Sequence, residues 1–216
     1  FGDLVTMRWW DDLWLNEGFA TWMAARTTQK LHPEWNTVLG KVGQRESAMS
    51  LDANATTHPV VQEIETVEQM AQAFDSITYQ KGSAVIGMLE GYVGGDAWRD
   101  GVRAYMKTHA YGNTKSDDLW NAVQTASGVP IVDIAHDFTL QPGIPLITVT
   151  SSTCTGGKTT LKLKQGEFTR DRPDKQSLTW RVPVIAQSVG GKPVRTLVEN
   201  GSGSIEVPGC APVILN

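Results

Sequence analysis

The pattern of apolar and polar residues divides the chain into a longer helical part and a shorter part rich in β-strands. In the helical part, apolar residues recur at three- and four-residue steps, which is the spacing of one helical face. Proline, glycine and capping residues mark where the helices begin and end. The expected helices cover Trp14 to Leu31, Thr66 to Phe74, Tyr79 to Val93, a segment after Asp96, a segment from Ser116 to Gly128, and Ile131 to Leu140.

Three residues are suited to cap the first turn of a helix. Thr66 stands three residues before Gln69, which is the spacing of a capping box. Asp96 and Ser116 carry side-chain oxygens that can accept from the free N–H groups at a helix start. We therefore expect Thr66, Asp96 and Ser116 to be N-caps.

From Ile144 onward the pattern changes to short runs that are rich in β-branched residues and separated by glycine and proline. Several runs alternate apolar and polar residues, as in Leu161 to Lys164. This arrangement is typical of a small antiparallel β-sandwich. We place the domain boundary between residues 143 and 144. The expected strands are Ile147 to Thr150, Thr159 to Leu163, Leu178 to Ala186, Val194 to Glu199 and Val213 to Leu215.

Composition narrows the class of protein. The 216 residues are 40% hydrophobic and 19% charged, which suits a globular chain with a buried core. A net charge of -4 argues against nucleic acid as the main partner, which would favour a basic face. No apolar run approaches the roughly 18 residues that a membrane-spanning helix needs, so we expect no transmembrane segment.

The two cysteines, Cys154 and Cys210, both lie in the last third of the chain. They could be buried free thiols, or they could form one disulfide in an exported protein. Both stand close to turn-forming glycines, where strand ends can meet, and this favours a disulfide across one end of the sandwich. Such a bond would favour an exported or periplasmic location.

A carboxylate in an apolar stretch is the first candidate for chemistry. Glu17 lies near the start of the first expected helix, among tryptophans and leucines. A buried carboxylate is costly unless it is paired, hydrogen-bonded or coordinated to a metal. Physical reasoning alone leaves two interpretations of equal weight: a functional ligand, or a structural residue that favours the helix dipole or pairs with Arg8.

The segment around Glu17 resembles the aminopeptidase-N-like zinc peptidases, the gluzincins. In that family an H-E-x-x-H helix is followed further along the chain by the Glu of an N-E-G-F-A block, and residues 16–20 read Asn-Glu-Gly-Phe-Ala here. The resemblance implies that Glu17 is the third ligand of one Zn²⁺ ion. It also implies that two further His ligands and the general base lie upstream of Phe1.

A second block supports the same resemblance. Residues 74–82 are similar to the family segment F-D-x-I-x-Y-x-K-G, and Tyr79 takes the position of the tyrosine that stabilises the tetrahedral intermediate. A lone tyrosine at a helix start is otherwise most simply a core residue. Asp75 and Lys81 could hold the Tyr79 segment in place, although a plain ion pair would explain them equally well. We interpret His58 as structural.

The resemblance implies an α+β fold: the helical half of a thermolysin-like catalytic domain in residues 1–143, then a β-sandwich in residues 144–216. The intact protein would be a zinc aminopeptidase that hydrolyses the N-terminal peptide bond of peptides. Zinc catalysis needs three protein ligands and an open position, so we expect this chain alone to be inactive. The alternative is a catalytically dead module that binds peptides or proteins. The presence of both Glu17 and Tyr79 argues against it.

Overall fold

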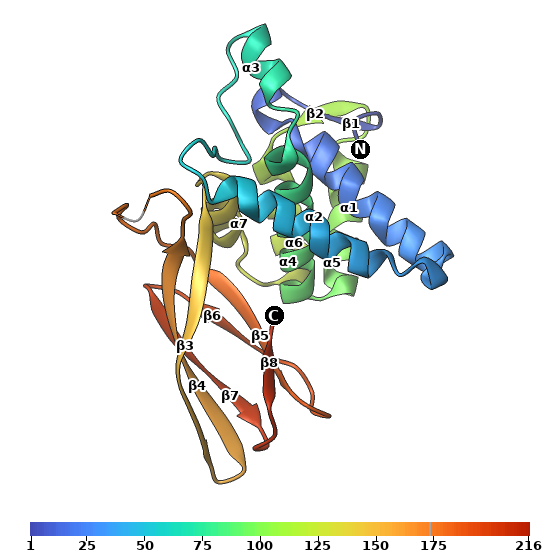
Figure 1. Cartoon of the computed structure of the whole chain (residues 1–216). Coiled ribbons are helices and arrows are strands. Elements are labelled where there is room, and N and C mark those ends of the chain that lie inside the picture. The colour runs from blue at the N-terminus through green and yellow to red at the C-terminus, as the bar shows by residue number, and fades with distance from the viewer. Residues whose placement is uncertain (173) are drawn as a thin grey trace. The chain divides into compact units, whose positions relative to one another are not determined.

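The computed structural model of the chain describes residues 1–172 and 174–216. These residues form two compact units, Phe1–Gly143 and Ile144–Asn216. The first unit is mainly helical, and the second is built of antiparallel strands (Figure 1). The α+β fold class expected from the sequence is confirmed.

The expected helices of the first unit all occur in the expected order, together with one α-helix and several short elements that were not expected. The π-helical turn η3 (Ile77–Lys81) precedes α4, and two short strands, β1 (Val5–Met7) and β2 (Gly112–Thr114), pair in parallel. Neither strand was expected from the sequence. The α-helices are α1 (Trp14–Leu31), α2 (Thr37–Asp52), α3 (Val67–Gln72), α4 (Gly82–Val93), α5 (Gly95–Thr108), α6 (Ser116–Ser127) and α7 (Val132–Thr139). Single 3-10 turns, η1 (Trp10–Asp12) and η2 (Pro33–Trp35), flank α1.

The capping predictions were correct for one helix and wrong for two. Thr66 caps α3 in a complete capping box, with its side chain accepting from the Gln69 N–H at 3.2 Å. Asp96 is the second residue of α5, whose N-cap is Gly94. Ser116 is the first residue of α6, whose N-cap is Lys115, and its hydroxyl forms hydrogen bonds inside the core.

That core is centred on buried tryptophans. The rings of Trp14 and Trp120 stack with their centroids 5.2 Å apart, and both side chains are fully buried. The Trp14 indole N–H donates to the Ser116 hydroxyl at 2.9 Å, and Ser116 in turn donates to the Asp12 carboxylate at 2.5 Å. Burial raises the pKa of Asp12, although the hydrogen bonds from Ser116 oppose the rise. A chain of hydrogen bonds therefore joins α1, η1 and α6 through the core.

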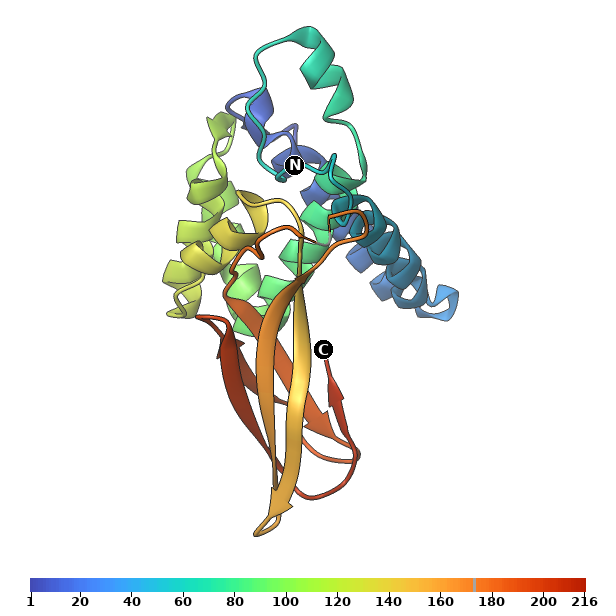
Figure 2. The same cartoon turned by 60° about the vertical axis from the view of Figure 1, so that its left-hand side comes forward.

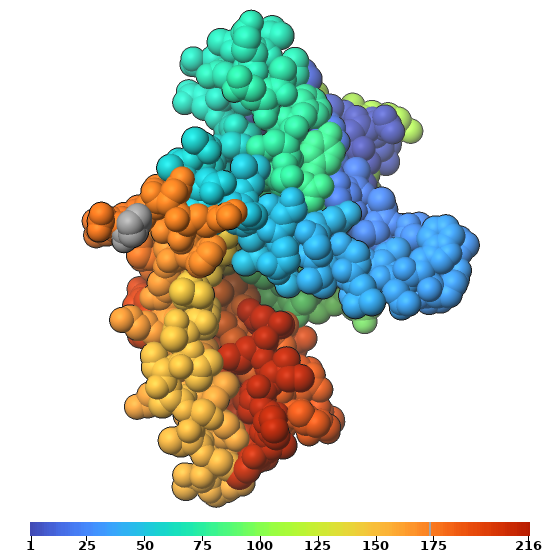
Figure 3. Space-filling view, in the orientation of Figure 1, coloured from blue at the N-terminus to red at the C-terminus, as the bar shows by residue number. Residues whose placement is uncertain are grey.

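Helix α2 was not expected from the sequence. It begins after Asn36, which has a left-handed backbone with φ of 49°. Most of its residues are exposed, and only Ala48 and Asp52 are buried. In the space-filling view α2 forms part of the surface of the first unit (Figure 3). Because so little of α2 is buried, its sequence lacks the apolar periodicity that marks the other helices.

The second unit consists of two three-stranded antiparallel sheets (Figure 2). One sheet has the order β3-β4-β7 and the other β6-β5-β8, and β7 contacts strands of both sheets. Along β4, Leu161 and Leu163 are buried, whereas Lys162 and Lys164 are exposed, as the alternation predicted. The strands are β3 (Ile144–Thr155), β4 (Lys158–Phe168), β5 (Val182–Ser188), β6 (Val194–Val198), β7 (Ser202–Pro208) and β8 (Val213–Leu215).

Five of these six strands overlap the expected runs, and β7 does not. The expected run from Leu178 begins too early, because β5 starts at Val182. Cys154 and Cys210 form a disulfide, with their Cα atoms 5.6 Å apart, so the predicted pairing is confirmed. Within residues 1–172 and 174–216, no helix has the length and apolar character needed to cross a membrane.

Candidate active site

Glu17 and Tyr79, the two residues singled out from the sequence, lie side by side in the structure. Glu17 is in the first turn of α1, and Tyr79 is in the middle of η3. Burial raises the pKa of the Tyr79 hydroxyl, and a hydrogen bond to the Glu17 carboxylate together with its negative charge raises this pKa further. The two motifs, far apart in sequence, therefore meet through their polar side chains.

Two glycines bring the backbones that carry these residues into close contact. A Cβ atom on Gly18 would lie 2.9 Å from the Thr78 carbonyl oxygen and 3.2 Å from the Gly82 Cα atom. A Cβ atom on Gly82 would lie 3.4 Å from the Gly18 Cα atom. Gly18, next to Glu17, and Gly82, three residues after Tyr79, thus allow α1 to pack directly on the backbone of η3 and α4.

Tyr79 is presented from a π-helical turn rather than from a regular α-helix. Such turns are rare and occur frequently at functional sites. The Asp75 carboxylate accepts from the N–H groups of Ile77 and Thr78 at 2.9 and 3.1 Å. The Asp75 main-chain carbonyl accepts from the Tyr79 N–H at 3.1 Å. Asp75 therefore satisfies the N–H groups of three consecutive residues around Tyr79.

His58 holds the other oxygen of the Asp75 carboxylate. Its Nε2 atom lies 2.7 Å from Asp75 Oδ2, and its Nδ1 atom lies 2.8 Å from the Pro59 carbonyl oxygen. Burial alone would lower the pKa of His58, but the hydrogen bonds to Asp75 and Pro59 outweigh it and raise the pKa. Burial would raise the pKa of Asp75, yet the hydrogen bonds from His58 and from the Thr78 N–H keep it lowered.

The opposite end of η3 is fixed by a buried ion pair. The Lys81 ammonium lies 2.8 Å from the Asp52 carboxylate, and their side chains are only 9% and 3% exposed. The other oxygen of Asp52 accepts from the Gly143 N–H at 2.8 Å and from the Thr57 hydroxyl at 2.6 Å. Burial lowers the pKa of Lys81, although the charge of Asp52 opposes this.

The sequence contained no signal that would have identified Asp52. It lies at the end of α2, the helix that the apolar pattern did not predict. Lys81 was expected to hold the Tyr79 segment or to form a plain ion pair, and in the structure it pairs with Asp52 next to that segment.

No cation neutralises Glu17 within the described part of the chain, since none of the salt bridges found there includes it. The pairing with Arg8 that was one possible interpretation is therefore not observed. A carboxylate without a cationic partner is a suitable zinc ligand. Among residues 1–172 and 174–216, however, no group of three His, Cys, Asp or Glu side chains could hold a metal ion.

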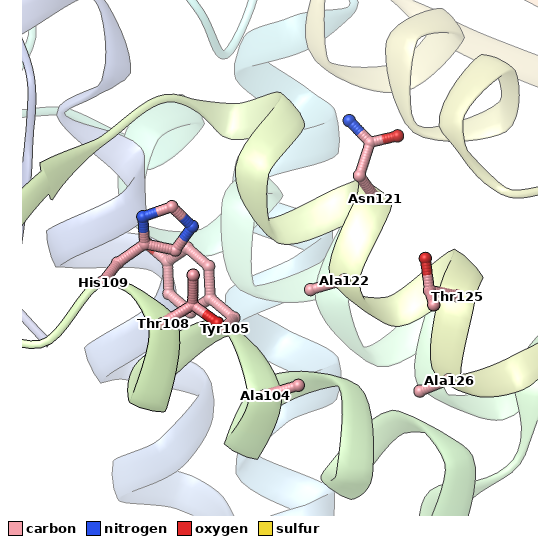
Figure 4. Close-up of a pocket in the computed structure, with 8 residues that line it drawn as sticks. All are labelled: Ala104, Tyr105, Thr108, His109, Asn121, Ala122, Thr125 and Ala126. Carbon is pink, nitrogen blue, oxygen red and sulfur yellow. The ribbon is translucent and has the colours of Figure 1, made fainter.

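The remaining histidines lie away from Glu17 and Tyr79. His32 stacks on Trp35 at the end of α1, and His136 contacts Asp117 at 2.6 Å on the surface. His109 lines a shallow hollow of about 340 Å³ between α5 and α6, together with Tyr105 and Asn121 (Figure 4). Neither Glu17 nor Tyr79 lines this hollow, so it is separate from the candidate site.

Comparison with known proteins gives consistent matches. Residues 1–138 match the peptidase family M1 domain. The chain is 35% identical over 208 residues to "Probable aminopeptidase 2" of Sulfurisphaera tokodaii, which covers 96% of this chain and 26% of that protein. It is 36% identical over 215 residues to "Aminopeptidase M1" of Arabidopsis thaliana, covering 98% of this chain and 24% of that protein.

A third relative is not named as an aminopeptidase. The chain is 36% identical over 201 residues to "Tricorn protease-interacting factor F2" of Thermoplasma volcanium, covering 93% of this chain and 25% of that protein. The chain therefore spans about a quarter of the length of the curated relatives that it matches.

Proposed function

The chain belongs to peptidase family M1, and on that premise we propose that it forms part of a zinc-dependent aminopeptidase that hydrolyses the N-terminal peptide bond of peptides. Two of the relatives described above are named aminopeptidases. Membership of a peptidase family implies peptide substrates. The net charge of -4 also suits peptides better than nucleic acid.

The observation that carries the proposal is the close approach of the Glu17 and Tyr79 segments: Gly18 packs on the Thr78 carbonyl and on Gly82, and the Glu17 carboxylate acts on the Tyr79 hydroxyl. Glu17 has no cationic partner among the described salt bridges, and its carboxylate acts on the Tyr79 hydroxyl. The backbones that carry both residues are held by direct packing and by hydrogen bonds. This arrangement suits a site in which one group binds a metal and the other donates to the substrate.

We assign Glu17 as one protein ligand of a single Zn²⁺ ion. Two histidines of an H-E-x-x-H motif, supplied from outside these 216 residues, would complete the set. When bound, the zinc supplies the Lewis acid that activates water and polarises the peptide carbonyl. This chain spans about a quarter of the length of its relatives, and a catalytic zinc site needs three protein ligands, so this chain by itself would be inactive.

Tyr79 has the complementary role. Its hydroxyl would donate a hydrogen bond to the carbonyl oxygen as that oxygen acquires negative charge. The raised pKa is consistent with a hydroxyl that keeps its proton near neutral pH. Glu17, which interacts with the same hydroxyl, keeps it close to the position of the reacting bond.

The disulfide between Cys154 and Cys210 supports an exported or periplasmic protein, because disulfides persist in oxidising compartments. The β-sandwich that carries it would space domains rather than take part in catalysis.

Zinc content of the intact protein tests the ligand assignment. Glu17→Ala should remove zinc or weaken its binding severely, and Glu17→Asp should do so less completely, because the shorter carboxylate cannot reach the same position. Glu46→Ala is a matched control, since Glu46 is an exposed glutamate of α2 that pairs only with its neighbour Arg45 in the described contacts. A full zinc complement in Glu17→Ala, measured by metal analysis, would show that the assignment is wrong.

A further inference from the structure

Asp75 controls the turn from which Tyr79 projects. N–H groups at the start of a helix have no partner within the helix and need an external acceptor. Asp75 is that acceptor. Its carboxylate accepts from the N–H groups of Ile77 and Thr78, and its main-chain carbonyl accepts from the N–H group of Tyr79. Ile77 and Thr78 are themselves buried, at 0% and 1% exposure. The direction in which the Tyr79 side chain leaves the backbone therefore depends on Asp75.

The Asp75 carboxylate is itself held in one orientation by His58. Both ring nitrogens of His58 face acceptors only: the Asp75 carboxylate and the Pro59 carbonyl. A ring can donate to two acceptors only when each nitrogen carries a proton, so this geometry favours the imidazolium form of His58 and a charge-assisted contact with Asp75. The charged groups that act on His58 are Asp75 and, less directly, Asp52.

The loop that carries His58 is anchored on both sides. On one side the Thr57 hydroxyl donates to Asp52 at 2.6 Å, and Asp52 is the partner of buried Lys81. On the other side the Val61 N–H donates to the Thr139 carbonyl of α7 at 2.9 Å. His58 is thus mounted on a fixed part of the first unit rather than on a loose surface loop.

We propose that Asp75 and His58 are a positioning pair that directs the Tyr79 hydroxyl toward Glu17 and so sets the rate of the catalytic step. Neither side chain is placed at the reacting bond, and both act through Tyr79. The catalytic part of this inference rests on the proposed function. The geometric part, that Asp75 sets the turn, can be tested separately.

Asp75 is the better target because the other anchor of η3 is unsuitable for substitution. Lys81 and Asp52 are buried, so removing either would leave an unpaired charge in the core and could unfold the protein. The His58 and Asp75 side chains are 27% and 26% exposed. Substitutions there can move the turn without burying an unpaired charge.

The test compares kcat and KM of variants in the intact protein, with zinc content measured alongside. Asp75→Ala should lower kcat roughly 10- to 100-fold, because a displacement of about 1 Å has effects of that size, with KM and zinc content nearly unchanged. Asp75→Asn should recover most of the loss, since its amide oxygen can accept the same two N–H groups. His58→Gln should fall between these two variants.

His136→Gln is the matched control. His136 forms a comparable contact with a carboxylate, 2.6 Å from Asp117, but it lies on α7, outside the Tyr79 segment. Its substitution should leave kcat unchanged. A loss of kcat in His136→Gln as large as that in His58→Gln would overturn the proposal, because any histidine–carboxylate pair would then have the same effect.

A double variant separates positioning from general damage. If Asp75 acts through the Tyr79 hydroxyl, adding Asp75→Ala to Tyr79→Phe should lower kcat less than about twofold further. If the full effect of Asp75→Ala persists in the Tyr79→Phe background, Asp75 acts by another route and the proposal is wrong.

Amide hydrogen exchange separates failure of this inference from failure of the proposed function. Asp75→Ala should increase exchange at Ile77 and Thr78, whereas His136→Gln should not. If Tyr79→Phe proves to have normal kcat but this protection is lost in Asp75→Ala, the proposed catalytic role of Tyr79 fails while Asp75 still sets the turn. Unchanged protection in Asp75→Ala would overturn the positioning pair whatever the kinetics show.

Discussion

Gly18 of α1 lies against Gly82 of α4 so closely that a Cβ atom on Gly18 would be 3.2 Å from the Gly82 Cα atom. The same Cβ atom would be 2.9 Å from the Thr78 carbonyl oxygen, which is backbone and cannot rotate away. This contact positions both site residues, because Glu17 directly precedes Gly18 and Tyr79 directly follows Thr78.

Gly18→Ala should therefore force α1 away from η3 and lower the free energy of unfolding by about 1–3 kcal/mol, as overpacking usually does. Gly87→Ala is the control, since Gly87 is exposed on α4 and a Cβ atom there would meet nothing within 4 Å. That variant should be neutral or stabilising by up to about 1 kcal/mol through helix propensity. Urea unfolding of the two variants checks the difference, and equal stabilities would contradict the packing argument.

Asp52→Asn should be among the most destabilising polar substitutions in the chain. It keeps an oxygen for Gly143 and Thr57 but leaves the buried Lys81 ammonium without its counter-charge. Breaking a buried pair in this way typically costs about 3–5 kcal/mol. Asp100→Asn, which alters an exposed pair with Arg99, should change stability far less, because solvent screens an exposed pair. Thermal unfolding of both variants tests the contrast.

The His58–Asp75 pair should make stability depend on pH in a defined direction. The pKa of His58 is raised from 6.5, so its contribution is fully present below pH 6.5 and is lost as pH rises through the raised value. The pKa of Asp75 is lowered from 3.8, so its contribution is present above pH 3.8 and is lost as pH falls through the lowered value. The pair stabilises most between these limits.

On going from about pH 5.5 to about pH 8.5, the wild-type chain should therefore lose on the order of 1 kcal/mol more stability than His58→Gln. Free energies of unfolding of both proteins at the two pH values measure this loss. Parallel pH profiles would mean that His58 does not gain its proton from the contact with Asp75.

The disulfide should stabilise the second unit against unfolding. Cys154 and Cys210 are separated by 56 residues, and closing a loop of that length corresponds to about 4 kcal/mol in the chain-entropy account. A double substitution to serine, or reduction with dithiothreitol, should lower the unfolding temperature of the β-strands. An unfolding temperature that is unaffected by reduction would contradict this expectation.

The helices and strands that could be predicted are those with one buried face. Leu161 and Leu163 alternate with lysines, and this alternation placed β4 correctly. Helix α2 was missed because it buries only Ala48 and Asp52, and β7 was missed because Gly203 within it resembles turn punctuation. Little of α2 is buried, so it leaves little periodic signal, whereas β7 does alternate, with Ile205 and Val207 buried and Ser204 and Glu206 exposed.

The sequence predicted the two main residues of the candidate site but not how they contact each other in the fold. Glu17 and Tyr79 stood out through their motifs, whereas their contact depends on the packing of Gly18, which no local pattern reveals. Ser116 was expected at a helix cap, but its hydroxyl serves Trp14 and Asp12 inside the core. The role of Asp52 could not be inferred, since its partners Lys81 and Gly143 are distant in sequence.

The central claim is that the Tyr79 hydroxyl stabilises the transition state beside a metal held in part by Glu17. Tyr79→Phe in the intact protein tests it most directly, because the substitution removes one hydroxyl and keeps the ring. We predict an unchanged zinc content, a KM close to that of the wild type and a kcat lowered by about 10²–10³, the typical cost of losing one oxyanion donor. A Tyr79→Phe enzyme that keeps more than about half of its kcat would contradict the account.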